Sequence, residues 1–214
     1  MFELLSKDVS EYAEAYTTPE SKILQQLNRE THIKVLNPRM LSGHMQGMML
    51  QMISHMIRPE RILELGTYTG YSAICLAQGL STNGIIHTIE YNIEQKEIIT
   101  RYINEAGLQN KIKLMIGDAM EIIPTLTDTY NLVFIDADKE NYLNYYEMIM
   151  PKLRAGGFIL IDNVLWDGKV LYPGKYTDEE TKTIVALNEH IKNDTRVEQL
   201  LLPFRDGLSI VRKK

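Results

Sequence analysis

The chain has 214 residues, of which 44% are hydrophobic, so it is long and apolar enough to bury a core as one α/β domain. Its 23 basic and 28 acidic residues give a formal net charge of −5, and the basic run 212–214 is short, which argues against a nucleic-acid-binding surface. The single cysteine, Cys75, excludes an intramolecular disulfide and a cysteine-rich zinc site.

The N-terminal residues do not resemble a targeting segment. Residues 1–8 include acidic side chains where a signal peptide would carry basic ones. No run approaches the roughly 18 apolar residues of a membrane-spanning helix. We therefore expect a cytoplasmic protein with neither nucleic-acid nor membrane partners.

The first quarter of the chain is predicted to be helical. Apolar residues recur every three to four positions over 19–35 and 44–57, which is typical of amphipathic helices. The second helix carries a methionine stripe, predicted to face the core, with a cofactor-binding stripe as the alternative. Its members are Met45, Met48, Met49, Met52 and Met56. We expect residues 1–57 to form a helical segment of a single domain, 1–214, whose α/β core is 58–214.

After Pro59, short apolar runs alternate with longer amphipathic stretches. The predicted strands are 61–65, 85–89, 112–116, 131–135, 157–161, 197–202 and 208–212. Helices are predicted from about 71, over 93–106, near 120, and over 142–153 and 178–193. This alternation predicts a mostly parallel sheet with helices on both faces. The five residues 203–207 are too few for a parallel crossover, so the last two strands should form an antiparallel hairpin at a sheet edge.

The end of the first predicted strand carries a glycine pattern. Gly66 and Gly70 permit a sharp turn and a close approach of the backbone to a ligand, and a helix N-terminus follows. A nucleotide-like ligand fits this arrangement. The spacing Gly-x-x-x-Gly differs from the Gly-x-Gly-x-x-Gly of dinucleotide folds, and no phosphate-loop lysine follows, so a pyrophosphate ligand is disfavoured.

Polar residues also end the second and third predicted strands. Glu90 is placed to accept hydrogen bonds from a ribose diol, and a solvated acid at the start of the next helix is the alternative. Gly117, Asp118 and Ala119 make a turn after the third strand. Because ligands of open α/β sheets bind at the carboxyl ends of the strands, these motifs support one another.

The fourth and fifth predicted strands end in candidate metal ligands. Asp136 and Asp162 supply carboxylates and Asn163 an amide oxygen, which suit Mg²⁺ and leave positions open for substrate oxygens. Lys139 is a candidate general base, because a nearby dication disfavours its ammonium form. Helix caps and turn formers remain the alternative explanation for each acid.

Taken together, these motifs resemble the cation-dependent O-methyltransferases, which include catechol and caffeoyl-CoA O-methyltransferases. The resemblance extends from about Met40 to the segment 206–208. It implies a single-domain, Rossmann-like class I methyltransferase fold with a seven-stranded sheet, mostly parallel, whose last strand is antiparallel. It also implies S-adenosylmethionine and a divalent cation, Mg²⁺ first with Mn²⁺ or Ca²⁺ as alternatives, a small diol or phenolic substrate, and a homodimer.

The resemblance also assigns roles to residues at the matching positions. The cofactor-binding set is Met40, Ser42, Glu64, Gly66, Thr67, Tyr68, Gly70, Ser72, Glu90, Asp118, Ala119 and Asp136. The metal ligands are Asp136, Asp162 and Asn163, and the catalytic pair is Lys139 with Asp136. In the implied reaction, Lys139 takes the proton of one hydroxyl of a vicinal diol, whose oxygen then attacks the sulfonium methyl group.

Two other functions remain open from the sequence. One is a nicotinamide-dependent oxidoreductase on a similar sheet, and the other is a catalytically idle cofactor-binding module. The sequence leaves undetermined the methyl acceptor and the position methylated, as well as the preferred cation and the oligomeric state. It also leaves open whether His44 touches substrate and whether aromatic residues of the loop 165–176 cover it.

Overall fold

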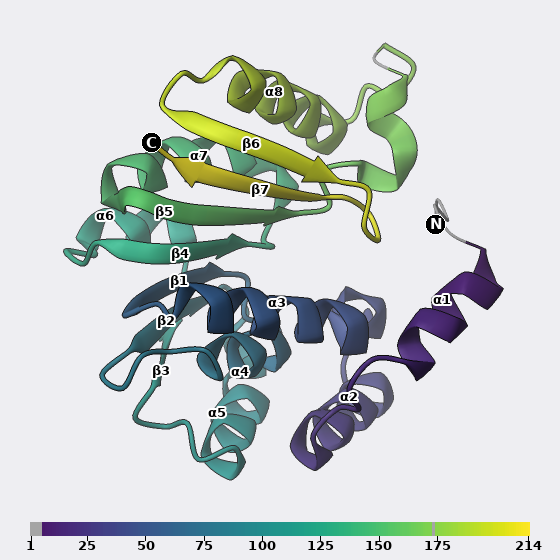
Figure 1. Ribbon diagram of the computed structural model, residues 1–214, viewed down its shortest axis with the longest axis vertical. Helices are drawn as coiled ribbons and strands as arrows, with labels where there is room; N and C mark the ends of the chain where they lie inside the picture. The colour runs from purple at the N-terminus through teal and green to yellow at the C-terminus, as the bar shows by residue number, and fades with distance from the viewer. Residues whose placement is uncertain (1–5, 173) are drawn as a thin grey trace. The chain divides into compact units, whose positions relative to one another are not determined.

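The computed structural model describes residues 6–172 and 174–214. Within this part of the chain, seven strands form one sheet in the order β3-β2-β1-β4-β5-β7-β6 (Figure 1). The pairs β1–β2, β2–β3 and β4–β5 are parallel, and β7 is antiparallel to β5 and β6. The predicted α/β fold with an antiparallel last strand is confirmed. No helix among the described residues is long and apolar enough to cross a membrane.

The contacts divide the described chain into two compact units, residues 6–122 and 123–214. The first contains the predicted helical segment, of which residues 1–5 lie outside the described part of the chain. The elements of the first unit are α1 (Lys7–Ala15), α2 (Lys22–Lys34), η1 (Pro38–Met40), α3 (Gly43–Ile57), β1 (Arg61–Leu65), α4 (Tyr71–Ala77), β2 (Ile85–Glu90), η2 (Ile93–Gln95), α5 (Lys96–Glu105) and β3 (Ile112–Ile116). That 1–214 is a single domain stays a prediction.

The register of the first unit aligns the ends of its strands. Leu65 of β1 lies opposite Ile89 of β2, and Glu90 of β2 lies opposite Ile116 of β3. The carboxyl ends of β1, β2 and β3 therefore lie along one edge, where the glycine pattern and Glu90 were predicted to meet.

The second unit begins within α6 (Ala119–Thr125) and contains the remaining strands. Its other elements are β4 (Tyr130–Ile135), η3 (Lys139–Asn141), α7 (Tyr142–Ile149), η4 (Met150–Lys152), β5 (Leu153–Asp162), η5 (Trp166–Leu171), α8 (Glu179–Asn193), β6 (Val197–Leu202) and β7 (Leu208–Lys213). Every residue of β4 is buried, as expected for a strand that is covered on both faces.

The last two strands form the predicted antiparallel hairpin, and the later strand is the inner one. β7 pairs with both β5 and β6, so β6 is the edge strand (Figure 1). Burial agrees with this order, since Leu208 and Val211 of β7 are buried whereas Leu200 of β6 is 54% exposed. Gly207 allows the hairpin to approach the loop after β5, because a Cβ there would lie 2.6 Å from Leu165 Cγ.

Helix α3 packs against α4 through small residues. The buried side of α3 consists of Gln46, Gly47, Leu50 and Ser54. A Cβ added to Gly47 would lie 2.5 Å from Tyr71 Cε1, so the two helices approach closely only because Gly47 has no side chain. Nearby, Ser54 Oγ donates a hydrogen bond to Leu76 O at 2.6 Å.

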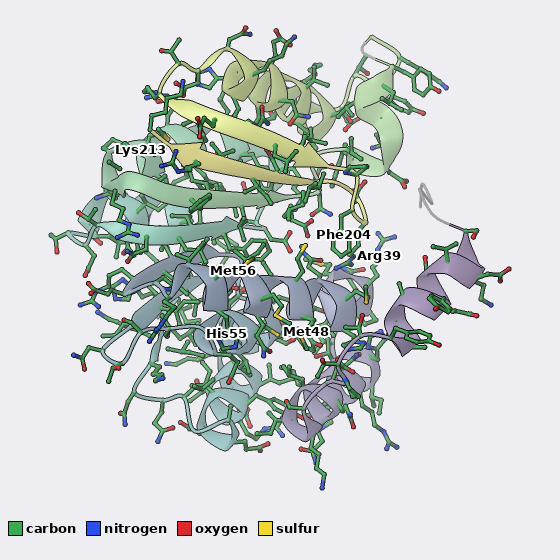
Figure 2. The ribbon with its side chains drawn as sticks, in the orientation of Figure 1. Arg39, Met48, His55, Met56, Phe204 and Lys213 are labelled. Carbon is green, nitrogen blue, oxygen red and sulfur yellow. The ribbon has the colours of Figure 1, made fainter. Side chains whose placement is uncertain are left out.

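The prediction that the methionine stripe of α3 faces the core is wrong. Met52 is 53% exposed and Met56 is 76% exposed, whereas the remaining three methionines are half-buried. Figure 2 shows Met48 and Met56 projecting from this helix. The methionines do share one side of the helix. The core side is instead the one with the small residues, because it allows the helix backbones to come closer.

Glu30 links α2 to α5 within the first unit. Its carboxylate accepts hydrogen bonds from Arg101 Nη2 at 2.6 Å, from Lys34 Nζ at 3.0 Å and from the Tyr102 hydroxyl at 2.8 Å. Hydrogen bonds from Arg101, then Lys34, then Tyr102 lower the pKa of Glu30 to about 2. A carboxyl group with a lowered pKa in the folded state stabilises the fold above its unfolded pKa, and this contribution is lost as the pH falls.

We therefore expect Glu30→Gln to lower the free energy of unfolding at pH 7 by about 1 kcal/mol, a small value because solvent screens the network. The difference between variant and wild type should shrink as the pH falls from about 4.5 toward 2. Urea unfolding at several pH values measures it. The control is Glu97→Gln on the exposed side of α5, and a Glu30→Gln effect that persists undiminished at pH 2 would contradict the assignment.

Candidate active site

The loop after β1 contains three residues with left-handed backbone. Gly66 has φ +92°, Tyr68 has φ +52° and Gly70 has φ +94°, a range that is easy for glycine and rare for tyrosine. The amides of Gly66 and Thr67 both donate to Ile89 O, at 3.0 and 3.2 Å, and Gly70 N donates to Thr67 O at 2.9 Å. The loop therefore turns sharply beside the end of β2.

Glu90 connects this loop to β2. Its carboxylate accepts hydrogen bonds from Tyr68 N at 2.7 Å and from Asn92 N at 2.8 Å. The side chain is 8% exposed, and burial raises the pKa of Glu90 although backbone hydrogen bonds oppose that effect. Gly117 N donates to Glu90 O at 2.9 Å, so the turn after β3 reaches the same place. Three of the segments predicted to bind the cofactor thus meet at one edge of the first unit.

Glu64 and Thr67 lie beneath the loop. Glu64 is fully buried, and its carboxylate accepts a hydrogen bond from the Thr88 hydroxyl, which in turn is hydrogen-bonded to the Thr67 hydroxyl. Ser72 is buried in the first turn of α4. These contacts fix the base of the loop. The contacts of Glu64, Thr67 and Ser72 with a cofactor stay predictions.

The remaining predicted cofactor residues lie at the margins of this region. Met40, at the end of η1, is 58% exposed, and Ser42 directly precedes α3. The Tyr68 hydroxyl donates to Leu36 O at 3.1 Å and to Asn37 O at 3.2 Å, which brings the chain just before η1 to the glycine loop.

Asp118 has a structural role in the turn after β3. Its Oδ1 accepts a hydrogen bond from Met120 N at 2.8 Å, which caps α6, while Ala119 is buried. The cap uses one carboxylate oxygen, so it does not conflict with the expected position of Asp118 and Ala119 beside an adenine. That position stays a prediction.

The second unit brings the two predicted metal-ligand clusters to neighbouring strand ends. Ile135 of β4 lies opposite Ile161 of β5, so Asp136 and Asp162, each the next residue, start from adjacent positions on strands about 4.8 Å apart. Asp162 is 5% exposed. Burial raises the pKa of Tyr142, and Asp136 and Asp162 both add to the rise, so both carboxylates lie within electrostatic reach of this phenol.

Lys139 is held beside Asp136 in this unit. Its Nζ donates hydrogen bonds to Asp136 Oδ1 at 3.0 Å, to Ala137 O at 3.0 Å and to the Tyr142 hydroxyl at 2.7 Å. Burial by itself would lower the pKa of Lys139, but Tyr142 and Asp136 raise it above the ordinary lysine value. The hydrogen bonds to Asp136, Ala137 and Tyr142 favour the ammonium form of Lys139, and its role as a neutral base stays a prediction.

Asp206 is a residue that the sequence interpretation missed. Its Oδ1 accepts a hydrogen bond from Asp167 N at 2.5 Å, its Oδ2 accepts a long one from Asn163 Nδ2 at 3.5 Å, and its backbone oxygen accepts one from Leu165 N at 2.9 Å. Asn163 has φ +59°, so the loop after β5 is held in an unusual backbone conformation. Because Asn163 Nδ2 points toward Asp206, Asn163 Oδ1 points away from Asp206. An acid in a hairpin turn looks like an ordinary turn former in the sequence, so no signal marked it.

A family model for O-methyltransferases matches residues 12–214. The chain belongs to the O-methyltransferase family. Among its relatives, caffeoyl-CoA O-methyltransferase 5 of Nicotiana tabacum is 34% identical over 179 residues, which are 78% of this chain and 75% of the relative. Caffeoyl-CoA O-methyltransferase 2 of Eucalyptus globulus is 35% identical over 78% of this chain and 72% of its own. The resemblance drawn from the motifs is confirmed, and the oxidoreductase alternative is not supported.

Solved methyltransferase structures match the fold of this chain over most of its length. The O-methyltransferase TomG of Streptomyces achromogenes, solved in complex with SAM, has a TM-score of 0.91 at 26% identity and covers 97% of this chain and 96% of its own. The O-methyltransferase of Bacillus cereus, solved with SAH, has a TM-score of 0.91 at 28% identity and covers 97% of both chains.

Aromatic residues of the methyltransferase follow the predicted metal ligands Asp162 and Asn163 in the loop 165–176. The Trp166 ring centroid lies 5.9 Å from Lys139 Nζ and 5.4 Å from Lys169 Nζ. Tyr172 is 57% exposed, and residue 173 lies outside the described residues. Trp166 is thus the loop aromatic placed beside Lys139, whereas a lid over the substrate stays a prediction.

His44 has two partners within the first unit. Its Nε2 lies 2.7 Å from Thr18 O, and its Nδ1 lies 3.5 Å from Glu14 Oε1. The contacts join the start of α3 to the segment between α1 and α2 through Thr18 and to α1 through Glu14. They favour a structural role for His44 over contact with substrate.

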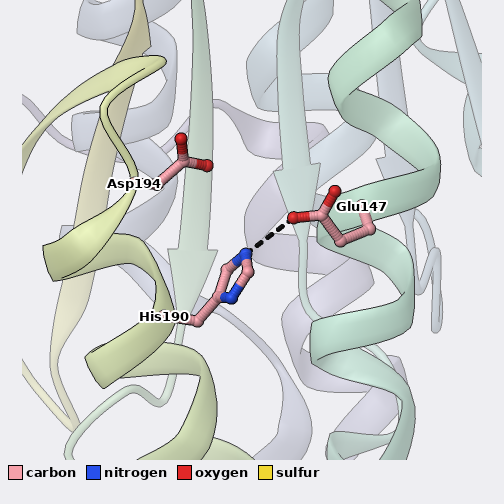
Figure 3. Close-up of side chains that lie close together, drawn as sticks. All are labelled: Glu147, His190 and Asp194. Atoms are coloured by element: carbon pink, nitrogen blue, oxygen red, sulfur yellow. Dashed lines mark hydrogen bonds and ion pairs between the residues drawn. The ribbon is translucent and has the colours of Figure 1, made fainter.

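A second cluster of possible metal ligands lies elsewhere in the second unit of the enzyme. Within residues 6–172 and 174–214, ligand atoms of Glu147, His190 and Asp194 lie within 4.8 Å of one another (Figure 3). His190 Nε2 lies 2.6 Å from Glu147 Oε1, and Arg196 Nη2 lies 2.6 Å from an oxygen of each carboxylate. Because the guanidinium already pairs with both carboxylates, we interpret this cluster as an ion-pair network and not as a metal centre.

Proposed function

We propose that this enzyme transfers the methyl group of S-adenosylmethionine to one hydroxyl of a catechol-like vicinal diol, in a reaction that depends on a divalent cation. The observation that carries the proposal is the adjacency of Asp136 and Asp162 at the ends of paired parallel strands, with Asn163 next in the chain. Membership of the O-methyltransferase family supplies the reaction class.

The donor set of these strand ends suits a hard cation. Two carboxylates and one amide oxygen are the ligand types that Mg²⁺ prefers, and Mn²⁺ and Ca²⁺ accept the same oxygens. Asp162 is buried, so water would screen little of its attraction to a bound cation. Lys139 supplies positive charge to Asp136. We propose Asp136, Asp162 and Asn163 as the ligands, with Mg²⁺ as the preferred ion.

The first unit supplies the proposed cofactor site. The relevant residues are the loop 66–70, Glu90 and the turn 117–119, which hydrogen bonds join at the carboxyl ends of β1, β2 and β3. Glu90 presents a buried carboxylate to a ribose diol. The SAM- and SAH-bound structures of the family relatives support this choice of cofactor.

The mechanism follows from the positions of the side chains. A bound cation supplies positive charge that lowers the pKa of a coordinated hydroxyl. As a neutral amine, the form that the charge of a bound cation would favour, Lys139 Nζ would take the proton of the reacting hydroxyl. SAM held at the carboxyl ends of β1, β2 and β3 would supply its sulfonium methyl group to the resulting oxygen, and S-adenosylhomocysteine would leave. Positive sulfonium and negative oxygen neutralise each other during transfer, so burial does not oppose the reaction and alignment of the reactants is a main source of rate.

The acceptor class follows from the donor set and from the relatives. A vicinal diol offers two adjacent oxygens to one cation, and the caffeoyl-CoA O-methyltransferase relatives are named for an acceptor of that kind. Trp166 beside Lys139 offers an aromatic surface for a planar acceptor. The homodimer and the cytoplasmic location implied earlier stay predictions.

Removal of divalent ions is the test of this proposal. We expect exhaustive chelation to lower methyl transfer to a catechol by about tenfold or more, because a metal contributes several kcal/mol to catalysis, and added Mg²⁺ to restore it. A matched acceptor with one hydroxyl on the same skeleton should be methylated poorly with or without Mg²⁺. Full turnover in the chelated, metal-free enzyme would refute the cation dependence.

A further inference from the structure

Helix α7 carries three buried tyrosines whose hydroxyls each contact a charged side chain. Tyr142 contacts Lys139, Tyr145 donates to Asp138, and Tyr146 donates to Asp194 at 2.8 Å. Tyr142 is the member of this set that contacts the proposed base. Its ring is fully buried, so the position of its hydroxyl is fixed by packing.

The Tyr142 hydroxyl completes a set of three acceptors around Lys139 Nζ. The other two acceptors are Asp136 Oδ1 and the backbone oxygen of Ala137, each at 3.0 Å. In its protonated form Nζ has three hydrogens to donate, so these acceptors match them in number. As the neutral amine that takes the proton of the acceptor hydroxyl, Nζ keeps two of these donations and has one lone pair. A lysine side chain has a flexible four-carbon stem that does not by itself fix the position of its nitrogen.

The three acceptors come from different parts of the chain, and they differ in whether they have another proposed role. Ala137 O belongs to the backbone just before η3, whereas Asp136 is a proposed cation ligand whose carboxylate is shared. Tyr142 differs from both. It contributes a side chain, which belongs to α7, and that side chain is not a proposed cation ligand. The Tyr142 ring also lies 4.8 Å from Nζ, so the contact involves both its hydroxyl and its ring.

We propose that Tyr142 is a positioning residue for methyl transfer, whose hydroxyl holds Lys139 Nζ in the place from which it meets the acceptor hydroxyl. This inference rests on the proposed function, because it requires that Lys139 act in the reaction. The hydroxyl takes no part in bond making, and its effect is to limit the positions that the flexible lysine can adopt. Small misplacements of a reacting group are costly to the rate.

The test compares Tyr142→Phe with Tyr146→Phe. Both variants remove one hydroxyl from a buried α7 tyrosine and keep the ring, and Tyr146 contacts Asp194 instead of Lys139. We expect Tyr142→Phe to lower kcat by about tenfold or more, with the acceptor KM and the SAM Kd unchanged. Tyr146→Phe should leave all three constants unchanged. Melting temperatures show whether the two variants are equally well folded.

A second measurement follows Lys139 directly, without turnover. The rate at which an amine reagent modifies Lys139, measured by mass spectrometry relative to Lys152, should rise in Tyr142→Phe and stay at the wild-type value in Tyr146→Phe. In a Lys139→Ala background, Tyr142→Phe should have no further effect on kcat, because the group that it positions is absent.

Two results would overturn the inference about Tyr142 and leave the proposed function intact. One is a Tyr142→Phe kcat equal to that of Tyr146→Phe, and the other is an equal kcat loss from Tyr142→Phe with and without Lys139. Wild-type turnover in Lys139→Ala would instead remove the function of Lys139 and with it the role of Tyr142. The modification rates would then still report whether the hydroxyl holds Nζ, which separates the two failures.

Discussion

Lys139→Ala should lower kcat by a factor of about 10² to 10⁴, the usual contribution of a general base, and should change the SAM Kd little. The reason is that Nζ lies against Asp136 at the end of β4, whereas the segments proposed to hold the cofactor follow β1, β2 and β3. Steady-state kinetics with a catechol acceptor gives kcat, and calorimetric titration with SAM gives the Kd. Turnover equal to that of the wild type would exclude Lys139 from the mechanism.

A second substitution separates proton transfer from charge at this position. Lys139→Arg keeps a cation beside Asp136, but a guanidinium does not give up its proton in proteins and so cannot act as a base. We expect Lys139→Arg to be as slow as Lys139→Ala. Recovery of most of the activity in Lys139→Arg would show that the charge matters and not the base. Lys152→Ala is the control, because Lys152 Nζ donates to the backbone oxygen of Leu126.

Gly79→Ala should destabilise the enzyme by about 3 kcal/mol, at the upper end for overpacking, because a Cβ there overlaps the backbone of Ser54 and His55. Backbone atoms of a packed helix cannot move aside as the end of a flexible side chain can. For a chain of this size the loss corresponds to a fall in melting temperature of about 6 to 12 °C. Thermal unfolding followed by circular dichroism measures it.

Two comparisons make the Gly79 prediction specific. Gln78→Ala changes the exposed neighbouring side chain and should shift the free energy of unfolding by less than about 0.5 kcal/mol. Ser54→Gly added to Gly79→Ala should not restore stability, because backbone atoms remain in the overlap. Rescue by Ser54→Gly, or a melting temperature of Gly79→Ala close to that of the wild type, would contradict the packing seen between α3 and α4.

Local patterns predicted the elements of the sheet well. The predicted bounds of β1, β3 and β6 match the structure, because each is a short run of strand-forming residues bounded by turn formers. The hairpin of β6 and β7 followed from the length of its link. The sequence could not tell which of the two strands is inner, since that depends on which one pairs with β5.

Periodicity was a weaker guide for α3. Methionine has the hydrophobicity of a core residue, so the stripe was assigned to the core. The helix instead buries the side with Gly47 and Ser54, against Tyr71 and Leu76 of α4. The gain from close backbone packing depends on the partner helix, which no pattern within residues 43–57 describes.

Some residues of the proposed site were predicted from the sequence, and others were found only in the structure. Residue types and their positions at strand ends were sufficient to select the glycine loop, Glu90 and the acids of β4 and β5, because parallel strands present their carboxyl ends at a common edge. Tyr142 and Asp206 were missed, since a tyrosine in a helix and an aspartate in a turn have ordinary structural explanations. Their contacts with Lys139 and Asn163 join residues that local sequence patterns treat separately. Chemistry carried by side-chain type can be recognised along the chain, whereas the positioning of those side chains depends on neighbours that only folding brings together.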